Sequence, residues 1–124
     1  MYPPKNEGGM FMDEYILFMI ERMSKVKEEA YDLLTRVNNL DNLNKKNAEQ
    51  YDNSEEMEEL HLQLAGKCGT LIYSYRDSKC KTIKSLIKTY AEGIYKRLFC
   101  YWLDHQEDDE ILDMCTALQK AFKF

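Results

Sequence analysis

Residues 54–101 have the sequence SEEMEELHLQLAGKCGTLIYSYRDSKCKTIKSLIKTYAEGIYKRLFCY, and this stretch decides the fold. Apolar residues recur in it every three or four positions, which is the period of a helix with one buried face. A one-residue shift in the period falls at residues 76–79, so we expect one long helix with a kink or a short break there. The apolar positions are Met57, Leu60, Leu64, Cys68, Leu71, Tyr75, Cys80, Ile83, Ile87, Tyr90, Ile94, Leu98 and Tyr101.

An unbroken helix of this length would be about 70 Å long, because each residue adds about 1.5 Å. A compact chain of 124 residues has a diameter of only roughly 35 Å. The helix is therefore expected either to break or to project from the domain and lie against another subunit.

Two shorter helices are expected before this stretch. In residues 10–23, ten of the fourteen residues are apolar, whereas an ordinary surface helix has a wider polar face. This helix is expected to lie at the centre of a bundle or to be covered by a partner chain. Ser24 is the expected N-cap of a second helix that ends near Asn38. Residues 1–9 and 40–53 are expected to be a flexible leader and a mobile loop.

The last helix is expected to start at Asp104, because residues 104–107 have the Asp-x-x-Glu form of a capping box. Acidic residues follow in its first turns, where their negative charge interacts favourably with the helix dipole and stabilises the helix. With only 5 Gly and 2 Pro, the chain lacks the turns of a β-sandwich or barrel. We predict one all-α domain of about four helices over residues 10–124. The apolar positions of the last helix are Ile111, Leu112, Met114, Cys115, Leu118, Ala121 and Phe122.

Composition excludes several classes of protein. The chain has 17 basic and 22 acidic residues, a net charge of -5 and 44% apolar residues, which is typical of a folded soluble protein. No apolar run reaches the about 18 residues that a membrane span needs. The four cysteines form no CxxC pair, which gives no support to a zinc ribbon. With no signal peptide recognised, we expect a reducing, intracellular location.

Candidate sites for catalysis are weak. His61 and His105 are the only histidines, and neither has a second histidine at i+4 or a Cys at ligand spacing. The cysteines lie on or beside apolar stripes, where packing is a simpler role than nucleophilic catalysis. We therefore expect no catalytic residue, no metal and no cofactor, and we expect that the chain is not an enzyme.

Basic residues gather in the middle of the chain, where residues 67–97 carry a net charge of +6. Lys81, Lys84 and Lys88, together with Lys79, follow one flank of the predicted long helix. Such a flank can contact nucleic-acid phosphates. A solvated flank, or ion pairs with the acidic segments on either side, explains it more simply. Direct binding of nucleic acid is therefore not expected.

Three segments resemble the helical domain of a GINS complex subunit, of the type called partner of Sld-five, number one. Residues 10–14 (Met-Phe-Met-Asp-Glu) resemble the start of the family's first helix, and residues 103–107 resemble the start of its last. Residues 75–80 resemble its Arg-Asn-basic-basic-Cys signature through Arg76, Lys79 and Cys80. Asp77 and Ser78 depart from that signature. The family's second, β-rich domain has no counterpart in residues 10–124.

The resemblance implies a non-catalytic scaffold in the nucleus. GINS is an assembly of four homologous helical subunits that joins the Mcm ring in the replicative DNA helicase. The alternative is a small free-standing helical adaptor or inhibitor, of viral or mobile-element type, that binds a basic protein surface. The residues expected to bind partner subunits are Phe11, Tyr15, Phe18, Met19, Arg76, Lys79, Ile87, Tyr90, Ile94, Leu98 and Tyr101, with Lys81, Lys84 and Lys88 as weaker candidates for nucleic acid.

Overall fold

The computed structural model describes residues 8–46 and 53–124, the side chains of residues 8–12 excepted. This part of the chain contains four helices and no strand, so the predicted all-α class and the number of helices are confirmed. No helix within it is long and apolar enough to cross a membrane. The helices are α1 (Gly8–Lys46), α2 (Ser54–Asp77), α3 (Lys81–Asp104) and α4 (Asp109–Phe122).

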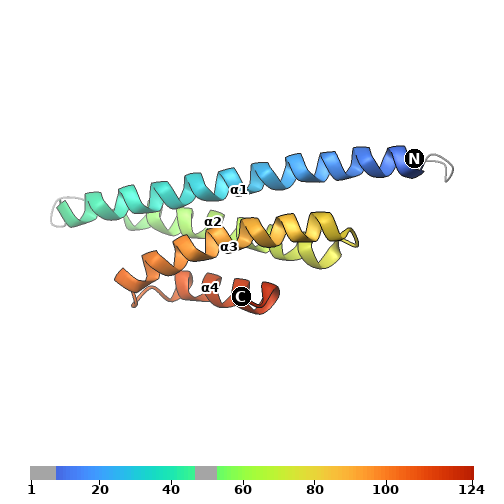
Figure 1. Ribbon diagram of the computed structural model, residues 1–124. Coiled ribbons are helices and arrows are strands. Elements are labelled where there is room, and N and C mark those ends of the chain that lie inside the picture. Colours follow the sequence, from blue (N-terminus) through green and yellow to red (C-terminus); the bar gives the residue numbers. More distant parts are fainter. Residues whose placement is uncertain (1–7, 47–52) are drawn as a thin grey trace.

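The four helices form an elongated bundle of three layers (Figure 1). The antiparallel pair α2 and α3 lies between α1 on one side and α4 on the other. α4 contacts α2 and α3 but not α1. The first turns of α1 extend past the turn that joins α2 to α3.

The longest helix is α1 and not residues 57–101. It runs for 39 residues without a break at Ser24, so the predicted boundary between the first two helices is wrong. Its buried side continues through Met23, Val26 and Ala30, and this continuous stripe outweighs the capping preference of a single Ser. The helix also includes Gly8 and Gly9 of the predicted leader and residues 40–46 of the predicted loop. Residues 1–7 and 47–52 of these predictions lie outside the described residues, and Asn53, the last residue of the predicted loop, is the N-cap of α2.

The long apolar stretch breaks where its period shifts. Ser78 and Cys80 have extended backbones, with ψ angles of 137° and 119°. The Ser78 hydroxyl accepts a hydrogen bond from the Cys80 N–H at 3.2 Å. The Lys84 ammonium donates to the Tyr75 carbonyl at 2.8 Å and lies over the Tyr75 ring. These side chains close the turn, so α3 folds back along α2 instead of projecting from the domain.

The start of α4 differs from the prediction. α4 begins at Asp109, and its N-cap is Asp108, whose carboxylate accepts from the Ile111 N–H at 3.0 Å. The predicted capping box at Asp104 is wrong, because the buried stripe of α3 carries that helix through Tyr101 to Asp104. Several acids follow one another here, and local spacing alone does not identify which of them is the cap.

The core follows the predicted stripes. Every apolar position listed for residues 57–101 is buried or half-buried. In α4 the stripe is also correct, except that Leu112 is 37% exposed. Complete burial of one such side chain contributes about 1.5–3 kcal/mol, so these positions provide most of the driving force for folding. Large side chains with less than 2% exposure are Met23, Leu34, Val37, Leu64, Leu71, Ile83, Ile87, Ile94, Leu98, Ile111, Leu118 and Phe122.

Candidate protein-interaction surface

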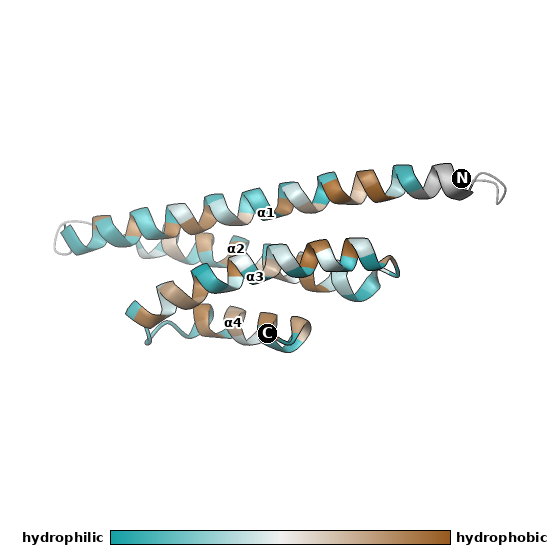
Figure 2. Cartoon of the chain, in the orientation of Figure 1, coloured by the Kyte–Doolittle hydropathy of each residue, from teal (hydrophilic) through white to brown (hydrophobic). Residues whose placement is uncertain are grey.

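Large apolar side chains are exposed on the first third of α1. Tyr15, Leu17 and Phe18 are 46%, 61% and 56% exposed, and we call these three residues the outer α1 surface. The other side of the same turns carries Ile16 and Met19, which pack against the core. This part of the helix is therefore apolar on both sides. Figure 2 shows these hydrophobic turns in brown near the end of α1 that passes the α2–α3 turn.

Charged residues surround the outer α1 surface. Asp13, Glu14, Glu21 and Arg22 are all exposed, and within the parts of the chain that the structure covers none of them forms an ion pair. An apolar centre with a charged rim is the usual anatomy of a protein–protein interface. Three acids and one base at this rim favour a partner whose own rim is basic.

The predicted partner-binding residues divide into two groups. Tyr15, Phe18, Arg76 and Lys79 are exposed, whereas Met19 and Tyr90 are half-buried. The side chain of Phe11 lies outside the described residues. Arg76 lies in the last turn of α2 and Lys79 in the turn that leads to α3, and neither is ion-paired to any residue of the described ranges.

For the second group the predicted role in partner binding is wrong. Ile87, Ile94 and Leu98 are completely buried, and Tyr101 is 7% exposed, so these four belong to the core of the chain itself. They present no surface to a partner. The helical period identified the buried face of α3, but it does not reveal whether a face is covered by the same chain or by another.

The basic flank of α3 is less open than its sequence indicates. Lys81 and Lys88 are exposed, but the ammonium group of Lys84 is bound to the carbonyl of Tyr75. Its position at the carboxyl end of α2 favours a structural role for Lys84, because cations stabilise helix C-termini. Only two of the three candidate lysines therefore point their charge to solvent.

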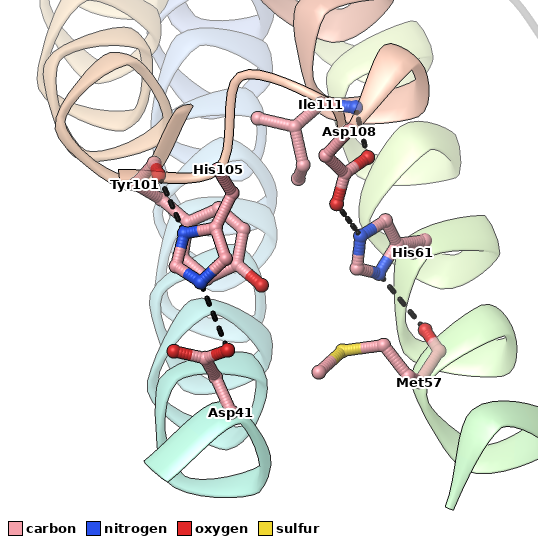
Figure 3. A network of polar contacts seen from close by, with 7 residues as sticks. All are labelled: Asp41, Met57, His61, Tyr101, His105, Asp108 and Ile111. Carbon is pink, nitrogen blue, oxygen red and sulfur yellow. Dashed lines mark hydrogen bonds and ion pairs between the residues drawn. The ribbon is translucent and has the colours of Figure 1, made fainter. Parts of the chain in front are cut away.

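A second polar cluster lies at the other end of the bundle, around the turn between α3 and α4 (Figure 3). His61 of α2 donates from Nδ1 to the Met57 carbonyl at 2.9 Å, and its Nε2 lies 2.8 Å from Asp108 Oδ2. His105 donates from Nδ1 to the Tyr101 carbonyl at 2.9 Å. Its Nε2 lies 2.8 Å from Asp41 Oδ1 of α1. Each histidine thus contacts a backbone carbonyl through Nδ1 and an aspartate carboxylate through Nε2.

The two His–Asp pairs differ in alignment. The His61–Asp108 pair is a hydrogen bond, whereas the Nε2–H of His105 is not aligned with the Asp41 oxygen and this contact is an ion pair. Burial of the His105 ring opposes its charged form. The hydrogen bond to the Tyr101 carbonyl and the nearby Asp41 carboxylate outweigh burial and raise the pKa of His105.

Three possible ligand groups also meet here, because donor atoms of His61, Asp108 and Glu110 lie within 4.8 Å of one another. One oxygen of Asp108 caps α4 and the other binds His61. The cluster is therefore explained as a capped helix start with a hydrogen-bonded His–Asp pair. The sequence did not indicate it, because His61 and Asp108 are 47 residues apart and no local motif joins them.

The buried cysteines are poorly suited to nucleophilic chemistry. Burial raises the pKa of the Cys68 thiol to about 12 and that of Cys115 to about 11. Because the thiolate is the nucleophile, both side chains are unreactive near neutral pH. Cys80 is half-buried and Cys100 is exposed.

A groove of about 370 Å³ runs between α1 and α3 beside His105. Its wall carries both signs of charge, and Asp41 and His105 both belong to it. The other residues that line the groove are Asn38, Asn42, Lys45, Lys96, Arg97, Cys100, Tyr101 and Asp104.

Comparisons of this chain with protein-family models, with curated proteins and with solved structures found no match.

Proposed function

We propose that this chain is a non-catalytic protein-binding subunit that presents the outer α1 surface to another protein. The observation that carries the proposal is the exposure of Tyr15, Leu17 and Phe18 on one turn of α1, where Tyr15 and Phe18 are neighbours at i, i+3. Single exposed apolar residues are normal, but adjacent large ones mark an interaction site. Aromatic side chains are also enriched among the residues that dominate binding energy.

The outer α1 surface supplies part of the free energy that binding needs. Complete burial of one such side chain is worth about 1.5–3 kcal/mol, and each is already partly covered. Three of them supply a few kcal/mol against the entropic cost of association. Phe11 is one helical turn before Tyr15 in sequence and was also predicted to belong to this interface.

The more specific form of the proposal is a GINS-like scaffold subunit of the replicative helicase, acting in the nucleus. It is supported by the order of the three sequence segments that resemble that family. It is also supported by Arg76 and Lys79, which match the family signature and are exposed. In this proposal they bind acidic groups of a neighbouring subunit.

The alternative is a free-standing adaptor or inhibitor of a basic protein. One observation favours it: the chain buries the central stripe of α3 by itself, so this stripe needs no partner subunit. The acidic rim of the outer α1 surface and the net charge of -5 suit a basic target.

The test is affinity capture of the full chain from its own cells, followed by mass spectrometry. The chain is compared with Phe18→Glu and with the control Leu62→Glu, which alters a side chain of α2 that is 68% exposed. Partners lost only with Phe18→Glu support the proposal. Helical subunits of similar size with Mcm proteins identify the GINS form, whereas one basic protein identifies the adaptor. If Phe18→Glu captures the same partners as the unchanged chain, both the GINS form and the adaptor form of the proposal are contradicted.

A further inference from the structure

The turn between α3 and α4 is held at both of its ends by a histidine–aspartate pair. His105 opens the turn and reaches Asp41 of α1, and Asp108 closes it and reaches His61 of α2. Between them, the Asp108 N–H donates to the His105 carbonyl at 2.9 Å. A segment of four residues is thereby connected to two helices that are distant in sequence (Figure 3).

Both imidazole rings face an oxygen at each nitrogen. The carbonyls of Met57 and Tyr101 only accept hydrogen bonds, and so do the carboxylates of Asp108 and Asp41. A neutral imidazole carries one N–H, so it satisfies only one of its two oxygen neighbours. The imidazolium form carries two. In His105 one of them is hydrogen-bonded to the Tyr101 carbonyl, and the other is attracted to the Asp41 carboxylate without being aligned for a hydrogen bond. In the neutral form with the proton on Nδ1, the Nε2 lone pair would stand 2.8 Å from that carboxylate oxygen, which is repulsive.

We propose that protonation of His105 fastens the α3–α4 turn to α1, and that loss of this proton releases the turn from α1. The His105–Asp41 pair acts as a pH-sensitive latch. This inference does not depend on the proposed function, because it concerns the opposite end of the bundle.

The groups around the His105 ring agree with this behaviour. His105 faces Asp41 and Lys45 of α1, lies on Tyr101, and shares the groove with Asp104, Lys96 and Arg97 of α3. Asp41 also pairs with Lys45 at 3.3 Å, so its carboxylate keeps a partner when His105 becomes neutral. The charged groups that face His61 are Asp108 and Glu110, from the turn and from α4.

Release is confined to the turn and its neighbours. α4 remains attached through Ile111, Leu118 and Phe122, all of which are at most 1% exposed. The part that changes is the wall of the groove between α1 and α3, to which Asp41 and His105 both belong. The latch therefore couples pH to the shape of that groove without unfolding the domain.

The sign of the effect follows from the raised pKa of His105. Its ordinary value is about 6.5. A raised value in the folded chain means that the Asp41–His105 pair stabilises the fold fully below about pH 6.5. The stabilisation is lost as the pH rises through the folded value.

The direct test is nitrogen NMR of the His105 imidazole ring in the full chain between pH 5 and pH 9. We expect both ring nitrogens of His105 to carry protons at pH 5.5, and one proton to be lost above pH 6.5. A neutral His105 ring with a single N–H at pH 5.5 overturns the latch.

Hydrogen exchange at the Asp108 amide measures release of the turn. After correction for intrinsic exchange, its protection is expected to fall as the pH rises and His105 loses its proton. Asp41→Asn preserves size and removes the charge, and should abolish that pH dependence. The matched control is Asp32→Asn, because Asp32 is another α1 aspartate in an i,i+4 pair, with Arg36. A protection that does not depend on pH, or an equal effect of both variants, refutes the proposal.

Discussion

The imidazole of His105 lies flat on the phenol ring of Tyr101, with ring centroids 4.0 Å apart and planes 5° apart. The same two residues are joined by the hydrogen bond from His105 Nδ1 to the Tyr101 carbonyl. Because Tyr101 is 7% exposed, its ring is a fixed platform. Stacking and hydrogen bonding together direct Nε2 toward α1, where it lies 2.8 Å from Asp41 Oδ1. The end of α3 therefore sets the geometry of the whole turn.

The first prediction concerns the pH dependence of stability. Replacement of His105 by Gln removes the group that titrates while keeping a polar side chain. The difference in unfolding free energy between the natural chain and His105→Gln should be largest below about pH 6.5 and shrink as the pH rises, because the pKa of His105 is raised in the fold. Urea unfolding at pH 5.5, 7 and 8.5 measures it. A difference that grows with pH would contradict the sign.

A second prediction separates the cap of α4 from the charge on it. Asp108→Ala removes the N-cap and leaves His61, 3% exposed, without its carboxylate, and should cost about 2 kcal/mol or more. Asp108→Asn can still cap the helix and should cost less. Asp104→Ala is the control, because Asp104 is exposed at the end of α3 and is not the cap. Equal losses of stability for Asp104→Ala and Asp108→Ala would contradict the assignment of the cap to Asp108 alone.

Adjacent residues of α3 test its buried face. Ile87 is fully buried, so Ile87→Asp places an unpaired charge in the core and should cost about 4 kcal/mol or more. Lys88 is exposed, and Lys88→Asp should change stability by about 0.5 kcal/mol or less. Urea unfolding followed by circular dichroism compares the two. Similar losses would mean that the face is wrongly assigned.

The two sides of α1 should respond differently to a charge. Phe18 is 56% exposed, and Phe18→Glu should leave the unfolding free energy within about 0.5 kcal/mol while lowering the binding of a hydrophobic dye. Met23, five residues later, is fully buried, and Met23→Glu should cost about 4 kcal/mol. If Phe18→Glu is as damaging as Met23→Glu, then Phe18 packs inside the chain.

Glycines in two helices make the last prediction. A Cβ at Gly66 of α2 meets nothing within 4 Å, so Gly66→Ala should stabilise the fold by about 0.5–1 kcal/mol through lower backbone entropy. A Cβ at Gly93 of α3 would clash with the Tyr31 hydroxyl. Gly93→Ala must displace the Tyr31 ring, over which Arg97 lies, and should gain less or lose stability. Thermal unfolding measures the stability of both variants. An equal gain in stability at both positions would contradict the close approach of Tyr31 to Gly93.

Local patterns predicted one part of the fold well. The period of residues 57–101 identified the buried positions, and its shift placed the break, because both depend on residues three or four apart. Helix ends were predicted less well. Ser24 and Asp104 have the chemistry of caps, but a buried stripe runs through each position and continues the helix. Packing against other helices outweighs a capping preference of about 1 kcal/mol.

The helical class of the chain and the apolar face of each helix can be derived from the sequence, because side-chain period and backbone preference are local properties. The packing of the helices against one another determined what covers each face: α3 is covered by its own chain, whereas Tyr15, Leu17 and Phe18 of α1 are left exposed. It also decided that His61 meets Asp108 and His105 meets Asp41. Those contacts join residues far apart in the sequence, and they exist only because three layers of helices bring the ends of α1 and α2 to one turn.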